Sequence, residues 1–262
     1  MNYNKSIKIL STLLTLFIGT TSIISLQETR LKQQELVTDD NYYLLEEQKL
    51  ASIAKLQKKL PSFGFNNMLA NLTYLNYVQY FGDRKARKMT GYSVVTDYFE
   101  DIVNRDPNFI QSHLVMSSAN SLFAAQPEDT VRLLNQALET VDPQVPNYPF
   151  LIWTYKATDE ILFLGDIEAA QNSYEMGASW ASMRNDDLGN EMAARFNKTA
   201  QFLASKPSAT QAQFGAWMNI LSTTSNSRTQ DLILEQIKDM GGTVNISPDG
   251  RLEIKPPKFD KA

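Results

Sequence analysis

Residues 153–178, WTYKATDEILFLGDIEAAQNSYEMGA, decide the fold that this sequence predicts. Apolar side chains recur at helical spacing on both sides of Gly165-Asp166: Trp153, Ala157, Ile161 and Leu164 before it, and Ile167, Ala170, Tyr174 and Ala178 after it. This spacing places each set on one face of a helix. The glycine–aspartate pair between them is typical of a turn. The stretch therefore predicts two paired amphipathic helices.

Two earlier segments have the same arrangement. Gly82-Asp83 and Gln126-Pro127 each separate two amphipathic stretches, and Asp106-Pro107 and Asp142-Pro143 each close a pair. The helices that follow the turns carry their apolar residues on one face: Val95, Phe99 and Ile102 in the first, and Val131, Leu134, Leu138 and Val141 in the second. Helix pairs that recur at roughly 36–44 residues are typical of an α-solenoid. The predicted fold class is all-α, with three to four helix pairs over residues 63–206.

The third unit resembles the tetratricopeptide repeat family. The residues that carry the resemblance are Leu162, Gly165-Asp166, Ala170, Tyr174 and Ala178. In that family a glycine turns the chain, an alanine permits close helix contact and an aromatic residue packs against the next pair. The departures are a longer period, Gln126 in place of the turn glycine and Gly177 in place of a helical alanine. The resemblance implies an elongated concave face that binds protein partners.

Three short strings resemble a poorly characterised group of membrane-anchored, repeat-containing proteins of cyanobacteria. They are Phe63-Gly64-Phe65-Asn66-Asn67, Tyr80-Phe81-Gly82-Asp83 and Leu162-Phe163-Leu164-Gly165-Asp166. This likeness implies a photosynthetic prokaryote or plastid, with thylakoid or other membrane complexes as partners. It implies no catalytic residue.

The N-terminus predicts a single membrane helix over residues 1–26. Lys5 and Lys8 precede an uncharged apolar run over residues 9–26, which is long enough to cross a bilayer as a helix. Hydroxyl side chains interrupt the run, and each can bond back to the preceding helical turn. The positive residues favour a cytoplasmic amino terminus, which would place the repeats on the translocated side, in a periplasm or thylakoid lumen. Arg30 and Lys32, just after the run, weaken this assignment.

Two alternatives remain open for this segment. It is also compatible with a cleaved signal peptide, although Thr20-Thr21-Ser22 matches a cleavage site poorly, and with a buried helix. Residues 27–62 are polar and favour helix, so they predict a stalk or linker, with a break at Asp39-Asp40-Asn41 and an end at Pro61.

Residues 207–262 predict a C-terminal helical cap, a hairpin and a tail. Helices are expected over 209–221 and 229–240, the second ending at Gly241-Gly242. Val244 and Ile246 alternate with polar residues before Pro248-Asp249-Gly250, and Leu252 and Ile254 alternate after it, which predicts a β-hairpin. Because a lone hairpin is marginally stable, we expect it to pack on a helix, in a cap that covers the apolar face of the last repeat, or to add to a partner's sheet.

Composition excludes several kinds of chemistry. The chain of 262 residues has no cysteine, one histidine and a formal net charge of −4. A disulfide framework, a thiolate metal site and a cysteine nucleophile are thus excluded, and the mild acidity argues against nucleic-acid binding. His113 is interpreted as a packing residue, because no nucleophile or orienting acid accompanies it. No catalytic, cofactor or metal residue is predicted.

Two groups of residues are candidates for partner binding. Arg84, Lys85, Arg87 and Lys88 form a basic run expected in an inter-helix turn, where it is either a solvated loop or a contact for anionic lipid or an acidic partner. Tyr77, Tyr80, Trp153 and Tyr155 belong to aromatic clusters that either fill the core or line the concave face.

These patterns together predict a membrane-anchored helical-repeat adaptor that binds protein partners and is not an enzyme. An exported soluble binding protein, released after signal cleavage, is the first alternative. A hydrolase whose acid and base are carboxylates is the second, and it would need a deep cavity lined by carboxylates.

Overall fold

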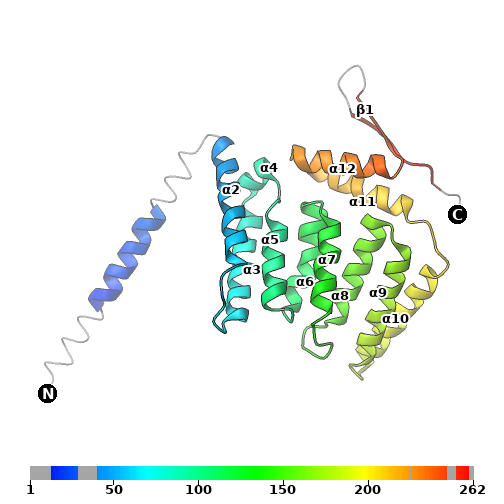
Figure 1. The fold of residues 1–262 in the computed structure, drawn as a ribbon, viewed down its shortest axis with the longest axis horizontal. Coiled ribbons are helices and arrows are strands. Elements are labelled where there is room, and N and C mark those ends of the chain that lie inside the picture. The colour runs from blue at the N-terminus through cyan, green and yellow to red at the C-terminus, as the bar shows by residue number, and fades with distance from the viewer. Residues whose placement is uncertain (1–12, 29–39, 225, 247–251, 260–262) are drawn as a thin grey trace. The chain divides into compact units, whose positions relative to one another are not determined.

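The computed structural model describes residues 13–28, 40–224, 226–246 and 252–259 (Figure 1). The chain divides into two compact units, Met1–Leu45 and Glu46–Ala262. The described residues are mostly helical and include one two-stranded antiparallel sheet. The predicted all-α class with a small hairpin is thereby confirmed.

In the first unit, residues 13–28 are helical, and their large apolar side chains are exposed. The hydroxyls of Thr20 and Thr21 donate to the carbonyls of Leu16 and Phe17, at 3.0 and 2.9 Å, as expected for hydroxyls in an apolar helix. Lys5, Lys8, residues 9–12, Arg30 and Lys32 lie outside the described residues. Among the residues that are described, no helix combines the length and the apolar character needed to cross a membrane.

The second unit begins inside helix α2 (Asp40–Gln57), so its first residues belong to the expected stalk. Helices α3 (Asn66–Gly82) and α5 (Val95–Arg105) then pack against each other. Between them lies α4 (Arg84–Thr90), where the sequence predicted only a turn. The turn prediction failed because Asp83 caps this short helix, its carboxylate accepting from the Ala86 amide at 3.1 Å.

Two further helix pairs follow, and in each the first helix ends in a π-helical segment. Helix α6 (Ile110–Met116) continues into η1 (Ser117–Phe123) and pairs with α7 (Pro127–Leu138). Helix α8 (Phe150–Asp159) continues into η2 (Glu160–Leu164) and pairs with α9 (Ile167–Ser182), which packs against α10 (Asp187–Leu203). The turn at Gly165-Asp166 is confirmed: Gly165 has φ +67° and Asp166 caps α9.

The core lies along the apolar faces that the sequence predicted. Val95, Phe99 and Ile102 are fully buried, as are Leu134 of α7 and Ala170 of α9. Because each helix covers one such face of its sequence neighbour, the contacts between elements are mainly local along the chain. Figure 1 shows α5 to α9 side by side in chain order.

The C-terminal cap covers a different surface from the one expected. Helices α11 (Thr210–Thr223) and α12 (Ser227–Asp239) lie across helix ends, and α11 packs against η2. Their core joins Trp217, Ile233 and Ile237 to Ala125 and Phe163, which lie at the ends of the second and third pairs. The cap therefore covers these ends and not the apolar face of the last pair.

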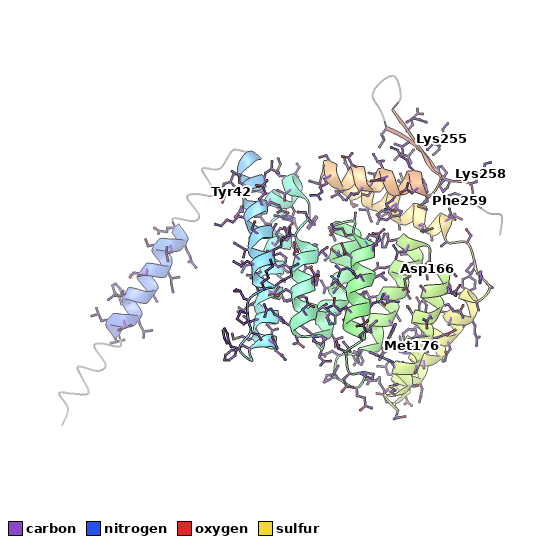
Figure 2. The ribbon with its side chains drawn as sticks, viewed as in Figure 1. Tyr42, Asp166, Met176, Lys255, Lys258 and Phe259 are labelled. Carbon is purple, nitrogen blue, oxygen red and sulfur yellow. The ribbon has the colours of Figure 1, made fainter. Side chains whose placement is uncertain are left out.

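The two strands of the predicted hairpin form, and β1 packs on α12. Strand β1 (Thr243–Ile246) is antiparallel to β2 (Leu252–Lys255), with Val244 opposite Ile254; residues 247–251, which include the expected turn, lie outside the described residues. The half-buried side chains of Val244 and Ile254 pack against the cluster that contains Ile237. Beyond β2, where a tail was expected, lies Phe259, which is labelled in Figure 2. Its ring packs against Phe214 of α11, with ring centroids 6.2 Å apart.

Candidate partner-binding pocket

Helix α4 presents one buried and one basic face. Its buried residues are Ala86, Arg87 and Thr90, whereas Arg84, Lys85 and Lys88 are exposed. Residues 84 and 88 are one helical turn apart and therefore share a face. The helix stops at Gly91, which has φ +72° and donates its amide to the Arg87 carbonyl at 2.9 Å. Asp83 and Gly91 thus fix the position of the basic run.

Arg87 differs from the other three cations because it is part of the core. Its guanidinium pairs with Glu47 at 2.7 Å and lies 3.6 Å from the ring centroid of Tyr80. Glu47 also accepts from the hydroxyls of Tyr80 and Ser93, each at 2.6 Å. Burial raises the pKa of Tyr80, so its hydroxyl remains a donor. This network attaches α2 to α3 and α4, and the charge of Arg87 is neutralised within it.

The exposed face of α4 borders a hollow of about 260 Å³, here called the α4 pocket. Its lining comes from four segments: Arg84, Arg87 and Lys88 of α4, Tyr92 after it, Leu122 and Phe123 of η1, and Thr223 at the end of α11 with Thr224 and Asn226 after it. The pocket therefore depends on the C-terminal cap as well as on the helix pairs.

One wall of the α4 pocket is aromatic and rigid. The ring of Phe123 packs edge-on against Phe81 and Tyr92, at centroid distances of 4.9 and 5.3 Å. Phe123 nevertheless remains 44% exposed and its neighbour Leu122 remains 38% exposed. Such residues offer apolar contact to a ligand without first having to rearrange.

The opposite wall is attached to α4 by Asn226. Its side-chain amide donates to the Met89 carbonyl at 3.2 Å, and its Oδ1 accepts from the Thr229 amide at 3.1 Å, which caps α12. A Cβ on Gly91 would lie 2.9 Å from Oδ1, so this close approach requires glycine. The cap is thereby fixed beside the basic face.

The rim of the pocket carries positive charge without local neutralisation. Within the described part of the chain, Arg84, Lys85 and Lys88 form no ion pair with a carboxylate. Burial raises the pKa of Tyr92, while Arg87 and Arg84 act in the opposite direction. The pocket thus combines two exposed cations, a phenol hydroxyl and an apolar wall.

The other candidate residues lie elsewhere. Tyr77 and Tyr80 are buried, in agreement with the core interpretation of the first aromatic cluster. Trp153 is half-buried and packs edge-on against Trp180 at 5.7 Å, whereas Tyr155 is 37% exposed. Neither of these, nor Lys85, lines the α4 pocket.

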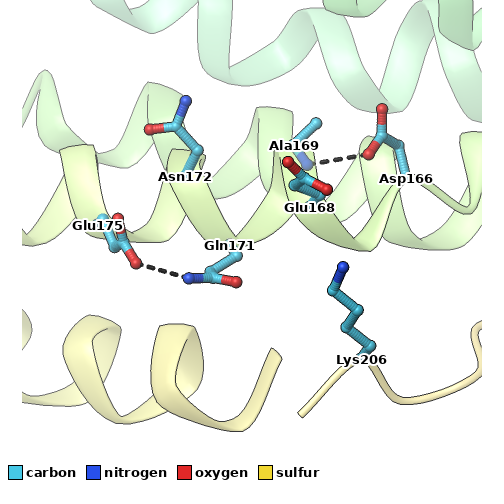
Figure 3. A pocket seen from close by; sticks show the side chains of 7 residues that line it. All are labelled: Asp166, Glu168, Ala169, Gln171, Asn172, Glu175 and Lys206. Atoms are coloured by element: carbon cyan, nitrogen blue, oxygen red, sulfur yellow. Dashed lines mark hydrogen bonds between the residues drawn. The ribbon is translucent and has the colours of Figure 1, made fainter. Parts of the chain in front are cut away.

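A wider hollow of about 750 Å³ runs along α9 (Figure 3). Its lining is polar and includes Asp166, Glu168, Glu175 and Lys206. Asp166 already caps α9 by accepting from the Ala169 amide, and Glu175 accepts from Gln171 at 2.8 Å. Across the described ranges, no group of three or more histidine and carboxylate side chains is placed to hold a metal ion. This open groove has no apolar wall to position a ligand.

The buried ionisable groups form internal hydrogen bonds. His113 is fully buried, its Nε2 lies 2.7 Å from the Pro107 carbonyl, and burial lowers the pKa of the imidazole to about 4. Lys156, Glu160 and Ser173 bond to one another inside the core. Sequence spacing could not reveal this cluster, because Ser173 lies on the following helix.

The sequence identified three of the nine residues that line the α4 pocket, namely Arg84, Arg87 and Lys88. Leu122, Phe123, Thr223 and Thr224 belong to no motif that marks a binding site. Asn226, just before an amphipathic run, is the residue with a usable signal, since asparagine is a common helix N-cap. No protein-family profile matches the chain, and neither a curated protein nor a solved structure matches it.

Proposed function

We propose that this protein is a membrane-anchored helical-repeat adaptor that binds a protein partner. The observation that carries the proposal is the α4 pocket, where exposed cations face a rigid apolar wall. Interfaces concentrate their binding energy in such places, where an aromatic or aliphatic contact is surrounded by polar groups.

The helix pairs from α3 to α10 support the repeat part of the proposal. Each pair packs mainly against its sequence neighbours, which is the contact pattern of an α-solenoid. The resemblance of residues 162–178 to the tetratricopeptide repeat family points to the same class. In such proteins the stacked pairs present an extended surface to a bound segment.

The membrane part of the proposal rests on the sequence of residues 9–26. The helical residues 13–28 expose their apolar side chains, as a lipid-facing segment would. Lys5 and Lys8 favour the translocated side for the second unit, in a periplasm or thylakoid lumen. The cyanobacterial likeness suggests that its partners are membrane complexes, including photosynthetic ones.

Alkaline carbonate washing of membranes tests the anchor. We expect the full-length chain to stay in the membrane pellet, with its N-terminus intact. Release into the supernatant, with a new N-terminus near residue 23, would instead establish the exported soluble alternative.

Site-specific photo-crosslinking in native membranes tests the adaptor. A photoreactive residue at Lys88, on the rim of the α4 pocket, should crosslink to one or a few defined proteins. The same residue at Lys198, an exposed position on α10, serves as the matched control and should give at least about tenfold less of these products. Equal crosslinking at both positions, or none at Lys88, would contradict an adaptor that works through this pocket.

A further inference from the structure

We infer that the α4 pocket binds an acidic peptide segment of the partner, which inserts one large apolar side chain against Leu122 and Phe123 while flanking carboxylates pair with Arg84 and Lys88. The inference rests on the proposed adaptor function and specifies the chemistry of the partner. Three features of the pocket support the inference: the positive charge of its rim, the volume of the hollow and a wall that is in place before binding.

Charge complementarity selects an acidic segment. Within the described residues, Arg84 and Lys88 form no ion pair with a carboxylate, although the protein as a whole carries more acidic than basic residues. Arg87, by contrast, is paired with Glu47 and contributes no free charge. Two exposed cations about one turn apart match two carboxylates on an extended or helical segment.

The α4 pocket favours a partner segment with a protruding side chain. Leu122 and Phe123 line a hollow, and each is less than half exposed. A bilayer surface contacts residues that project into it, whereas a recessed apolar wall is reached only by a group that enters the hollow. A volume of about 260 Å³ accommodates a single large side chain rather than an extended hydrophobic stretch.

The wall is already in place before binding. Phe123 is held by edge-on contacts with Phe81 and Tyr92, and the opposite wall is held by Asn226 on the Met89 carbonyl. A preformed pocket lowers the entropic cost of binding, so a short segment is sufficient for measurable affinity.

The test measures peptide binding to the full-length chain in detergent by fluorescence polarisation. The probes are an array of 15-residue glycine–serine peptides that carry one Phe, Leu or Trp flanked by Asp and Glu at varied spacing. Matched peptides replace the acids by Lys, or replace the apolar residue by Ser. We expect a subset of the acidic apolar peptides to bind and both matched sets to bind at least about tenfold more weakly.

Charge reversal locates the binding. The double variant Arg84→Glu with Lys88→Glu should weaken the best peptide about tenfold or more, and Leu122→Asp should do the same. A matched double variant, Lys49→Glu with Lys198→Glu, reverses two exposed cations elsewhere and should leave the affinity within about twofold. Unchanged affinity in the α4 variants, or equal binding of the Ser-substituted peptides, would overturn the inference.

A lipid is tested as the rival occupant. Dihexanoyl phosphatidylglycerol, used below its micelle concentration, should compete with the peptide no better than dihexanoyl phosphatidylcholine. If no peptide binds and the anionic lipid binds in a manner that depends on Arg84 and Lys88, the occupant is a lipid and the inference is wrong. Photo-crosslinking at Lys88 to a defined protein, combined with no peptide binding, would overturn the acidic-peptide inference and leave the adaptor function standing.

Discussion

Two buried titratable side chains, Asp159 and His113, make the stability of the fold change with pH in opposite directions. Asp159 accepts from the Ser117 hydroxyl at 3.0 Å, but its Oδ2 is buried without a hydrogen-bond partner within the described structure. Burial, with a smaller effect from Glu160, raises the pKa of Asp159 to about 7. For His113, burial lowers the pKa to about 4. Each side chain stabilises the fold most at the pH values where it is neutral, because burying a charge in a packed core is costly.

The pH dependence of Asp159 predicts that Asp159→Asn gains stability relative to wild type as the pH rises. A folded-state pKa above the unfolded value of roughly 3.9 means that the native state binds the proton more tightly, so the stability contributed by the protonated carboxyl is lost between pH 4 and 7. Asparagine stays neutral throughout. The variant should therefore improve relative to wild type by up to about 3 kcal/mol between pH 5 and 8.5.

Urea unfolding of both proteins at several pH values gives this difference. Taking the difference between variant and wild type removes the contribution of His113, whose protonation destabilises the fold below about pH 6.5 in both proteins. A difference that stays constant with pH would show that Asp159 is ionised in the native state.

At the scale of elements, the positions of α2 and α4 depend on contacts between the two helices. Taken alone, residues 40–57 favour a solvated stalk helix and residues 84–90 favour a loop. In the structure the buried pair of Glu47 and Arg87 connects them, and Lys58 adds bonds to Asp97 and Glu100 of α5 at 2.7 and 2.6 Å. The second half of the expected stalk is consequently part of the compact second unit.

Removal of Glu47 should loosen this attachment. Glu47→Ala leaves the Arg87 guanidinium buried without its carboxylate, which we expect to lower the free energy of unfolding by about 3–5 kcal/mol. Trypsin cleavage at Lys49 and Lys55 of α2 should become faster in the same variant. Glu46→Ala, on the adjacent residue, is the matched control and should change stability by less than about 1 kcal/mol. If both variants behave alike, α2 does not depend on the Glu47–Arg87 pair.

At the scale of the second unit, the C-terminal cap packs against the ends of the helix pairs. Phe163 of η2 and Trp217 of α11 are 54 positions apart in the sequence, yet their rings meet edge-on at 5.2 Å. The same cap supplies Thr223, Thr224 and Asn226 to the α4 pocket. Stability of the cap and integrity of the candidate site are therefore expected to be linked.

A double-mutant cycle measures the contact between the cap and the helix pairs. Trp217→Ala alone should cost about 3–5 kcal/mol, since it empties a fully buried site. Because Phe163 packs on the Trp217 ring, each single change already removes their shared contact. The double variant should therefore cost about 0.5–1.5 kcal/mol less than the sum of the two single changes. Guanidinium unfolding provides the four values. Additive costs would indicate that the cap does not pack on η2 in solution.

The sequence by itself determined most helices, although not α4, together with their buried faces, the turn at Gly165-Asp166 and the two strands of the hairpin. These depend on the local periodicity of apolar residues and on the backbone preferences of glycine and aspartate. Only the tertiary structure decided where α2 and the cap pack, that Arg87 is a core residue while Arg84 and Lys88 remain exposed, and that these cations face Leu122 and Phe123. Those arrangements join residues that are far apart in the chain. Burial and ion pairing between such residues depend on three-dimensional proximity, which no local pattern encodes.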